Sequence, residues 1–116
     1  MAHESEITHL DSASAIVTVR GRLTTGSHLS VTQAQLTRLV DTGVTHLLID
    51  LSSVEYLDSA ALGMLIQING ELRTRSGELR LAGANARILS LLRLTGTEQM
   101  LNVYPDMESG RTGFAS

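Results

Sequence analysis

The stretch of this sequence best suited to chemistry is YLDSAALGML, residues 56–65, in which the carboxyl group of Asp58 directly precedes the hydroxyl group of Ser59. Such a pair before an apolar helical stretch typically caps the helix, because either side chain can accept a hydrogen bond from a free backbone N–H. The hydroxyl group could also carry a phosphate, since the N-terminus of a helix favours negative charge. The pair therefore predicts a helix start and leaves a modification or a nucleophilic role open.

A hydrolase that uses Ser59 as its nucleophile would need a base and an orienting acid elsewhere in the chain. His46 or His28 could be the base, and Asp50 could orient it. The chain has no G-x-S-x-G motif, however, and a histidine in an apolar strand, such as His46, is usually structural. A metal site would need histidines at the spacing of helical or hairpin ligands. None of the four histidines has this spacing to another; they are His3, His9, His28 and His46. We therefore expect neither a catalytic residue nor a metal site.

The helix expected after Asp58 has distinct surfaces when its residues are placed at 100° intervals. Its core face carries the apolar residues Ala61, Leu62, Leu65, Ile68 and Leu72. Beside this face runs a narrow strip, named here the Ser59 strip, which consists of Ser59, Gly63, Ile66 and Gly70. Each glycine costs a helix about 1 kcal/mol relative to alanine, and its missing side chain favours a close approach. The approaching object could be another element of the same chain or a separate partner.

Hydrophobic periodicity predicts strands that alternate with helices along the rest of the chain. The expected strands are 6–10, 15–21, 44–51, 77–83 and 101–104, and the expected helices are 28–40, 58–75 and 86–95. Asn85 is expected to cap the last of these helices and Gly96 to end it. This alternation is typical of a mostly parallel or mixed sheet covered by helices.

The length of 116 residues fits one domain, with a core at about 5–105. The remaining residues, 106–116, have only Met107 and Phe114 to anchor them. We therefore expect this tail to be loosely ordered.

The composition argues against several classes of function. The formal net charge is −3, and the arginines near residue 75 are interspersed with glutamates, so no basic face for nucleic acid is expected. The absence of cysteine excludes disulfides and thiolate metal sites. The first ten residues do not resemble a signal peptide, and no apolar run is long enough to span a membrane. These features predict a cytoplasmic domain without direct contact to nucleic acid or membrane.

The segment LLIDLSSVEYLDSAALGML, residues 47–65, resembles the signature of STAS domains, and most closely that of bacterial anti-sigma factor antagonists (anti-anti-sigma factors). The residues that fit the signature are Asp50, Leu51, Ser52, Val54, Leu57, Asp58, Ser59, Leu62 and Gly63. Together with the segments GELRLAG and LLRLTG, the resemblance covers residues 5–105. It implies a single α/β STAS domain with a mixed four- to five-stranded β-sheet covered by about three to four α-helices.

The resemblance also implies a function in transcription regulation and stress response by partner switching. In this family the unphosphorylated protein captures an anti-sigma factor that is also a serine kinase, and thereby releases a sigma factor. Phosphorylation of the serine that maps onto Ser59 blocks the capture, and a phosphatase reverses it. The domain would then be no enzyme and would need no cofactor, because the partner kinase supplies ATP and Mg²⁺. It would act as a monomer or weak dimer.

The partner-binding residues implied by this mapping are Thr24, Thr25, Asp58, Ser59, Ala60, Gly63, Ile66 and Gly70. The sequence departs from the family pattern at Ala60 and Ala61, where a serine or threonine and a glycine are usual. It also has Arg22 and Thr24 where the family usually has a glutamate and an aspartate. An alternative function is therefore a STAS subunit of a larger lipid-transport or stress-signalling assembly, which would use the same edge without a phosphorylation cycle.

Overall fold

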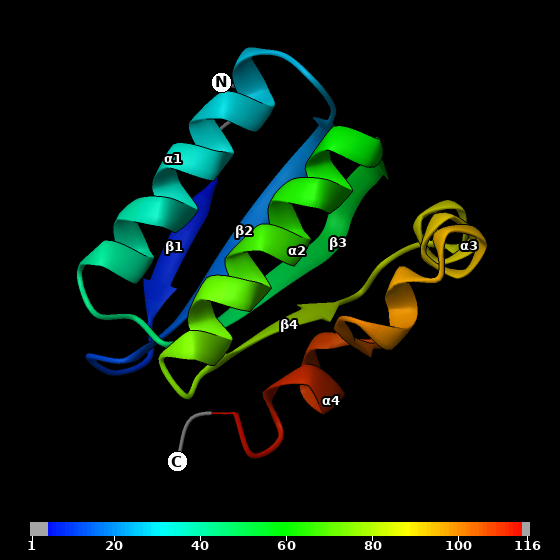
Figure 1. The fold of residues 1–116 in the computed structure, drawn as a ribbon. Helices are drawn as coiled ribbons and strands as arrows, with labels where there is room; N and C mark the ends of the chain where they lie inside the picture. Colours follow the sequence, from blue (N-terminus) through cyan, green and yellow to red (C-terminus); the bar gives the residue numbers. More distant parts are fainter. Residues whose placement is uncertain (1–4, 115–116) are drawn as a thin grey trace.

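A five-stranded β-sheet forms the centre of the computed structural model, which describes residues 5–114 (Figure 1). The strands lie side by side in chain order. They are β1 (Glu6–His9), β2 (Ser14–Leu23), β3 (His46–Leu57), β4 (Glu78–Ala82) and β5 (Asn102–Tyr104). β1 pairs with β2 in antiparallel orientation, and the remaining neighbours are parallel. The predicted mixed sheet and the predicted order of strands and helices are confirmed.

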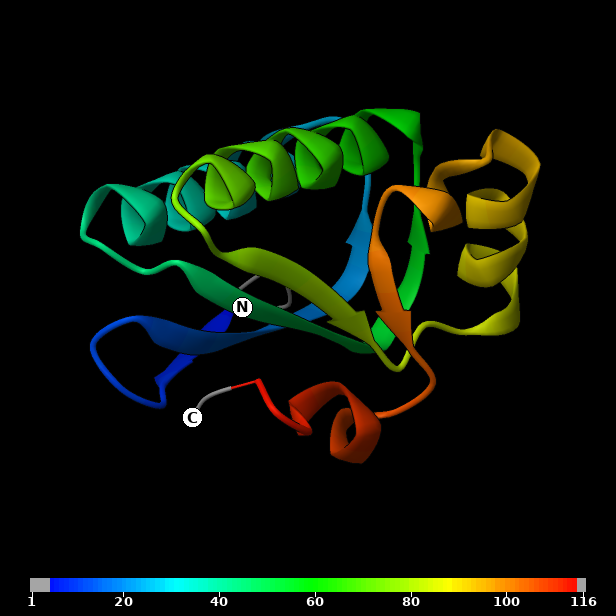
Figure 2. The same ribbon diagram turned by 60° about the horizontal axis from the view of Figure 1, so that its bottom comes forward.

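Helices cover both faces of the sheet (Figure 2). The long helices α1 (Ser27–Asp41) and α2 (Ser59–Thr74) lie side by side on one face, and the short helix α4 (Met107–Arg111) lies against the other. Helix α3 (Ala86–Thr95) lies beside the carboxyl-terminal part of β3 and is followed by a 3-10 turn, Thr97–Gln99. The three parallel crossovers require helices between the strands, which explains why strands and helices alternate along the chain.

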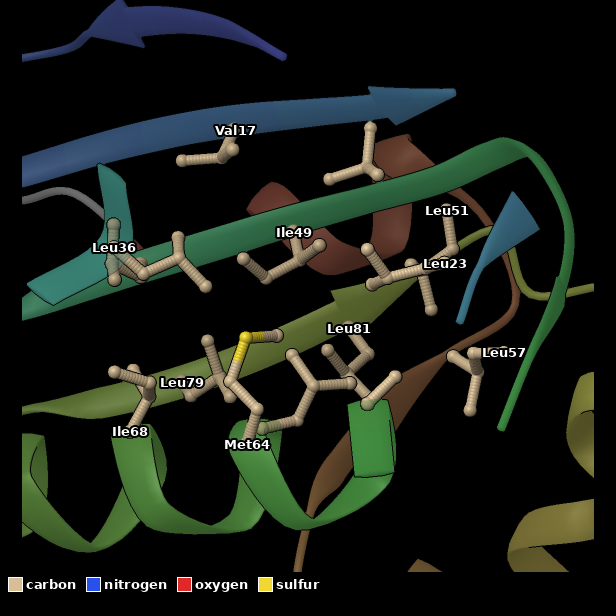
Figure 3. Packing of buried hydrophobic residues seen from close by; sticks show 14 of the residues in the cluster. Val17, Leu23, Leu36, Ile49, Leu51, Leu57, Met64, Ile68, Leu79 and Leu81 are labelled. Carbon is tan, nitrogen blue, oxygen red and sulfur yellow. The ribbon is translucent and has the colours of Figure 1, made fainter. Parts of the chain in front are cut away.

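The main core lies between the sheet and the pair α1 and α2 (Figure 3). Alternate residues of the central strands point into it, as the two-residue period of a strand requires. The buried strand residues include Val17, Val19, Leu47, Ile49, Leu51, Leu79 and Leu81. Helix α2 contributes all the residues predicted for its core face, and each of them is at most 4 % exposed. The predicted period of this helix is therefore confirmed.

β2 and β3 are both longer than predicted, and an irregular pairing explains the difference. The register between these strands shifts after Thr18 and again after Gly21, where the glycine adopts a φ of 81°. A bulge of this kind bends the strand and interrupts the alternation of polar and apolar residues. β3 likewise passes through the exposed Ser52 and returns to the core at Val54. Gly21 and Leu51, the predicted last residues of the two strands, therefore lie inside them.

The chain after residue 105 also differs from the prediction of a loosely ordered tail. Residues 107–111 form α4, and Phe114 is 3 % exposed on the second face of the sheet. The partner that orders this segment is the buried Arg80 of β4, whose Nη1 donates to the carbonyl oxygens of Gly110 (2.9 Å) and Thr112 (2.8 Å). Residues 115 and 116 lie outside the described part of the chain.

Candidate functional site

The start of α2 is fixed by the side chain of Asp58. This residue is the N-cap, and its Oδ1 accepts a hydrogen bond of 2.9 Å from the backbone N–H of Ala61. Its Oδ2 accepts from both the backbone N–H (2.8 Å) and the hydroxyl group (3.1 Å) of Thr25. The backbone N–H of Asp58 in turn donates to the carbonyl oxygen of Leu23. One carboxylate therefore joins the loop between β2 and α1 to the first turn of α2.

These hydrogen bonds lower the pKa of Asp58. Partial desolvation raises the pKa, but the N–H groups of Thr25 and Ala61 and the hydroxyl group of Thr25 outweigh it by stabilising the charged form, so the pKa lies below the ordinary value of 3.8. A group whose pKa falls on folding stabilises the folded state above its unfolded pKa, and this contribution disappears as the pH falls through the folded pKa.

We therefore expect Asp58→Asn to lower the free energy of unfolding at pH 7 and to have a progressively smaller effect as the pH falls below 3.8. Asparagine is also a good N-cap residue, so the helix start is retained. The difference reports the lost charge together with the acceptor oxygen that Oδ2 offers to Thr25, since the amide group has only one acceptor oxygen. Urea unfolding of both proteins between pH 3 and pH 7 measures the effect. Asp106 has a lowered pKa of its own because of Ser109, but both proteins share it and it cancels in the comparison. A pH-independent difference between the two proteins would contradict the expectation.

Ser59 is exposed as the first residue of α2, and the two glycines of the Ser59 strip face outward with it. Gly63 and Gly70 are exposed, and a Cβ atom built on either would have no neighbouring atom within 4 Å. Ile66 is partly buried against the main core. Among the described residues, no element of the chain approaches the two glycines, so their missing side chains leave a surface open to a partner.

The structure gathers most of the predicted partner-binding residues at one corner of the molecule. Thr25 touches Asp58 directly, Thr24 precedes it in the same loop, and the exposed Ala60 follows Ser59. The strip then continues along the helix from Ser59 to Gly70 for about 16 Å. Ile66 and Gly70 are therefore separated from the corner, and a partner must lie along the helix to contact the whole set.

The residues considered for a hydrolase are not assembled around Ser59. His46 lies at the opposite end of β3, where its Nδ1 is 2.9 Å from the hydroxyl oxygen of Thr45. The carboxylate of Asp50 accepts from Ser52, and Nδ1 of the buried His28 lies 2.8 Å from the carbonyl oxygen of Arg22. In residues 5–114 no group of three potential ligands could hold a metal ion, and His3 is outside this range. No helix there is long and apolar enough to cross a membrane.

Two residues at the end of β3 and the start of α3, Tyr56 and Arg87, were not identified from the sequence, and Arg22 was noted only as a departure from the family pattern. Arg22 and Tyr56 are direct neighbours on β2 and β3, and the guanidinium carbon of Arg87, at the start of α3, lies 4.7 Å from the centre of the Tyr56 ring. Each residue is ordinary by itself, and the three are far apart in the sequence. Only the pairing of the strands and the position of α3 bring them together.

Comparisons with known proteins place this geometry in a family. The model of the STAS domain matches residues 4–110, which is nearly the whole chain. The anti-sigma-B factor antagonist of Listeria monocytogenes is 36% identical over 55 residues, which cover 47% of this chain and 48% of that protein. The chain thus spans about half the length of the curated relative that it matches.

Solved structures share the fold at low sequence identity. An anti-sigma factor antagonist from Mycobacterium paratuberculosis aligns with a TM-score of 0.82 and 21% identity over 97% of this chain and 94% of its own. Unphosphorylated SpoIIAA, an anti-sigma factor antagonist, aligns with a TM-score of 0.79 and 14% identity over 95% of this chain and 96% of its own. Phosphorylated SpoIIAA from Bacillus aligns with a TM-score of 0.71 and 13% identity over 91% of this chain and 96% of its own.

The same fold also occurs outside this group of regulators. A sulfate transporter family protein from Wolinella succinogenes aligns with a TM-score of 0.73 and 14% identity over 91% of this chain and 88% of its own. Likeness at such identities establishes the architecture, whereas the match to the family model covers both halves of the signature around Asp58 and Ser59. The chain belongs to the STAS domain family.

Proposed function

We propose that this protein is an anti-sigma factor antagonist that captures an anti-sigma factor with serine kinase activity, releases a sigma factor, and is switched off by phosphorylation of Ser59. The observation that carries the proposal is the exposed hydroxyl-bearing residue at the first position of α2, at the head of a solvent-facing strip. The protein would act in the cytoplasm as a monomer or weak dimer. It would bind neither ATP nor Mg²⁺ itself, because the kinase supplies both.

The relatives support this proposal in two ways. The Listeria protein that shares 36% identity over 55 residues is named an anti-sigma-B factor antagonist. SpoIIAA, which shares the fold, has been solved in both an unphosphorylated and a phosphorylated form. A phosphorylation cycle is therefore compatible with this architecture.

The geometry explains how a phosphate at Ser59 would act without unfolding the domain. The N-terminus of α2 tolerates the added charge of about −2, because helix dipole and free N–H groups favour an anion there. The same charge would stand beside the carboxylate of Asp58 and at the head of the Ser59 strip. A partner that packs onto the strip would have to desolvate this charge, which opposes binding.

Intact-mass spectrometry tests the modification after incubation with a candidate anti-sigma kinase, ATP and Mg²⁺. We expect the wild-type protein to gain one phosphate, Ser59→Ala to gain none, and the control Ser90→Ala, which changes an exposed serine on α3, to gain one. A phosphatase should reverse the gain. A phosphate that persists in Ser59→Ala, or a cognate kinase that captures the wild type and leaves it unmodified, would refute the switch.

Gly63→Leu should weaken capture of the anti-sigma factor by about tenfold or more, because a branched side chain would stand in the middle of a close contact. The thermal midpoint should stay nearly unchanged or rise slightly, since the new side chain meets no neighbour and leucine is favoured over glycine in a helix by up to about 1 kcal/mol.

Calorimetric titration and thermal unfolding of the same Gly63→Leu sample measure both quantities. Thr74→Leu is the matched control, because it adds apolar surface to an exposed position in the last turn of the same helix, beyond the end of the strip and about 16 Å from Gly63. Unchanged capture would remove the Ser59 strip from the interface. A large loss of stability would show that the position packs internally.

The alternative function is a STAS subunit of a larger assembly. The occurrence of this fold in a sulfate transporter family protein supports this alternative. In such an assembly the Ser59 strip would be a permanent interface. Co-purification with the same partner at equal yield from wild type and Ser59→Asp, with no phosphate on either, would support the assembly and contradict the switch.

A further inference from the structure

A cationic and aromatic surface lies at the carboxyl ends of β2 and β3, the end of the sheet at which α2 begins, and it consists of Arg22, Tyr56 and Arg87. We call it the arginine platform. Arg22 and Tyr56 are register partners at the carboxyl ends of β2 and β3, so their side chains emerge side by side from the same face of the sheet. The guanidinium group of Arg87 lies over the Tyr56 ring, with its carbon 4.7 Å from the ring centre. Ser59 follows Tyr56 by only three positions.

The platform is held in place by the start of α3. The side chain of Asn85 caps this helix by accepting from the N–H of Ile88 (3.0 Å). Its Nδ2 donates to the carbonyl oxygens of Val54 (3.2 Å) and Glu55 (2.9 Å) at the end of β3. Ile88 is fully buried beneath the helix. The cation on α3 is therefore fixed relative to the strand that carries Tyr56, and both arginines remain exposed.

The charges of the platform are available to a partner. Arg20 forms an ion pair with Glu6, and Arg80 forms one with Glu78, whereas no ion pair in the described part of the chain involves Arg22 or Arg87. The neighbouring Asp58 already directs its carboxylate to Thr25 and Ala61, and no ion pair in the described residues joins the exposed Glu55 to either arginine.

We propose that the arginine platform binds a carboxylate-rich segment of the protein that the Ser59 strip captures, and that it selects partners by charge. This inference rests on the proposed function. Arginine matches carboxylates because its planar guanidinium group can donate two parallel hydrogen bonds to one of them. Arg22 and Arg87 are both exposed and take part in no ion pair of the described residues, so a partner surface that complements them carries carboxylates. A phosphate on Ser59 would then repel the same acidic segment that the platform attracts.

A hexaglutamate peptide tests the platform without the anti-sigma factor. Titrated into the ¹⁵N-labelled protein, it should shift the amide signals of residues 22, 56 and 87 at millimolar concentration. Arg22→Glu should abolish these shifts, and Arg73→Glu should retain them, because Arg73 is an exposed arginine in the last turn of α2, about 20 Å along the helix from Ser59. Shifts that concentrate elsewhere, or that survive Arg22→Glu, would overturn the proposal.

The same variants are then compared for capture of the anti-sigma kinase. Arg22→Glu should weaken capture by about tenfold or more, since it places a like charge against an acidic surface, and it should reduce the salt dependence of the dissociation constant. Arg73→Glu should leave both unchanged. Normal capture by Arg22→Glu would overturn the platform and leave the proposed function standing. Peptide binding at the platform without capture of any serine kinase would overturn the proposed function and leave the platform standing.

Discussion

Ser59→Asp should weaken capture of the anti-sigma factor by about 100-fold, which corresponds to roughly 2.8 kcal/mol of binding free energy. The aspartate places a permanent charge on the first residue of α2, beside Asp58. Its charge must be desolvated against the partner or repelled by it, whereas the helix start accepts an acid without loss of stability. Isothermal titration calorimetry measures the affinity, and thermal unfolding verifies that the domain remains folded.

Two controls make this result specific to the position. Ser59→Ala removes the hydroxyl group without adding charge and should capture the partner as the wild type does. Ser76→Asp adds the same charge to an exposed position just beyond the far end of α2 and should also bind normally. Full binding by Ser59→Asp would eliminate the electrostatic mechanism, and weak binding by Ser59→Ala would show that the hydroxyl group itself contacts the partner.

Arg80→Ala should lower the free energy of unfolding by about 3 kcal/mol, because it removes several interactions of a buried side chain at once. The guanidinium group donates hydrogen bonds to the carbonyl oxygen of Gly110, within α4, and to that of Thr112, directly after α4. Its carbon lies 5.0 Å from the centre of the Tyr104 ring and 5.3 Å from that of Phe114. Without it, the carbonyl groups lose charge-assisted donors and the rings lose a cation–π partner. Urea unfolding measures the change.

Hydrogen exchange shows where the lost stability of Arg80→Ala is located. The amides of residues 106–114 should exchange faster than those of the main core, because Arg80 is their principal polar contact with the sheet. Arg75→Ala is the control, since this exposed arginine also donates to a carbonyl oxygen, that of Val40 at 2.8 Å, and should cost only about 1 kcal/mol. Equal losses in the two variants would contradict the assigned role of Arg80.

The sequence predicted the elements well where the hydrophobic period is undisturbed, and α2 shows why. Its core face follows the helical period without interruption, so the buried side could be identified without any knowledge of its neighbours. Asn85 and Gly96 were likewise predicted as the caps of α3, because capping depends on residues close in sequence. The ends of β2 and β3 were wrong because bulges exist only between paired strands.

The sequence identified most residues of the candidate site, but it did not identify the hydrogen bonds that join them. Either Asp58 or Ser59 could have capped α2, and the structure assigns the cap to Asp58. Thr25 was included as a neighbour of the site only through the resemblance, since a hydrogen bond across 33 positions leaves no local signal. The order of the segment around Phe114 depends on Arg80 in the same way. Polar contacts between residues far apart in the sequence therefore could not be predicted from sequence patterns.

The arrangement of Asp58 has a consequence for the chemistry of the phosphorylation reaction itself. Transfer of a phosphoryl group to a serine is helped by a general base that receives the hydroxyl proton. Asp58 is the adjacent carboxylate, but both of its oxygens already accept hydrogen bonds, and its lowered pKa makes it a weak proton acceptor. Under the proposed function, this chain presents the acceptor oxygen and the kinase must bring the base. A kinase lacking its own base should therefore leave Ser59 unmodified even when it binds the domain tightly.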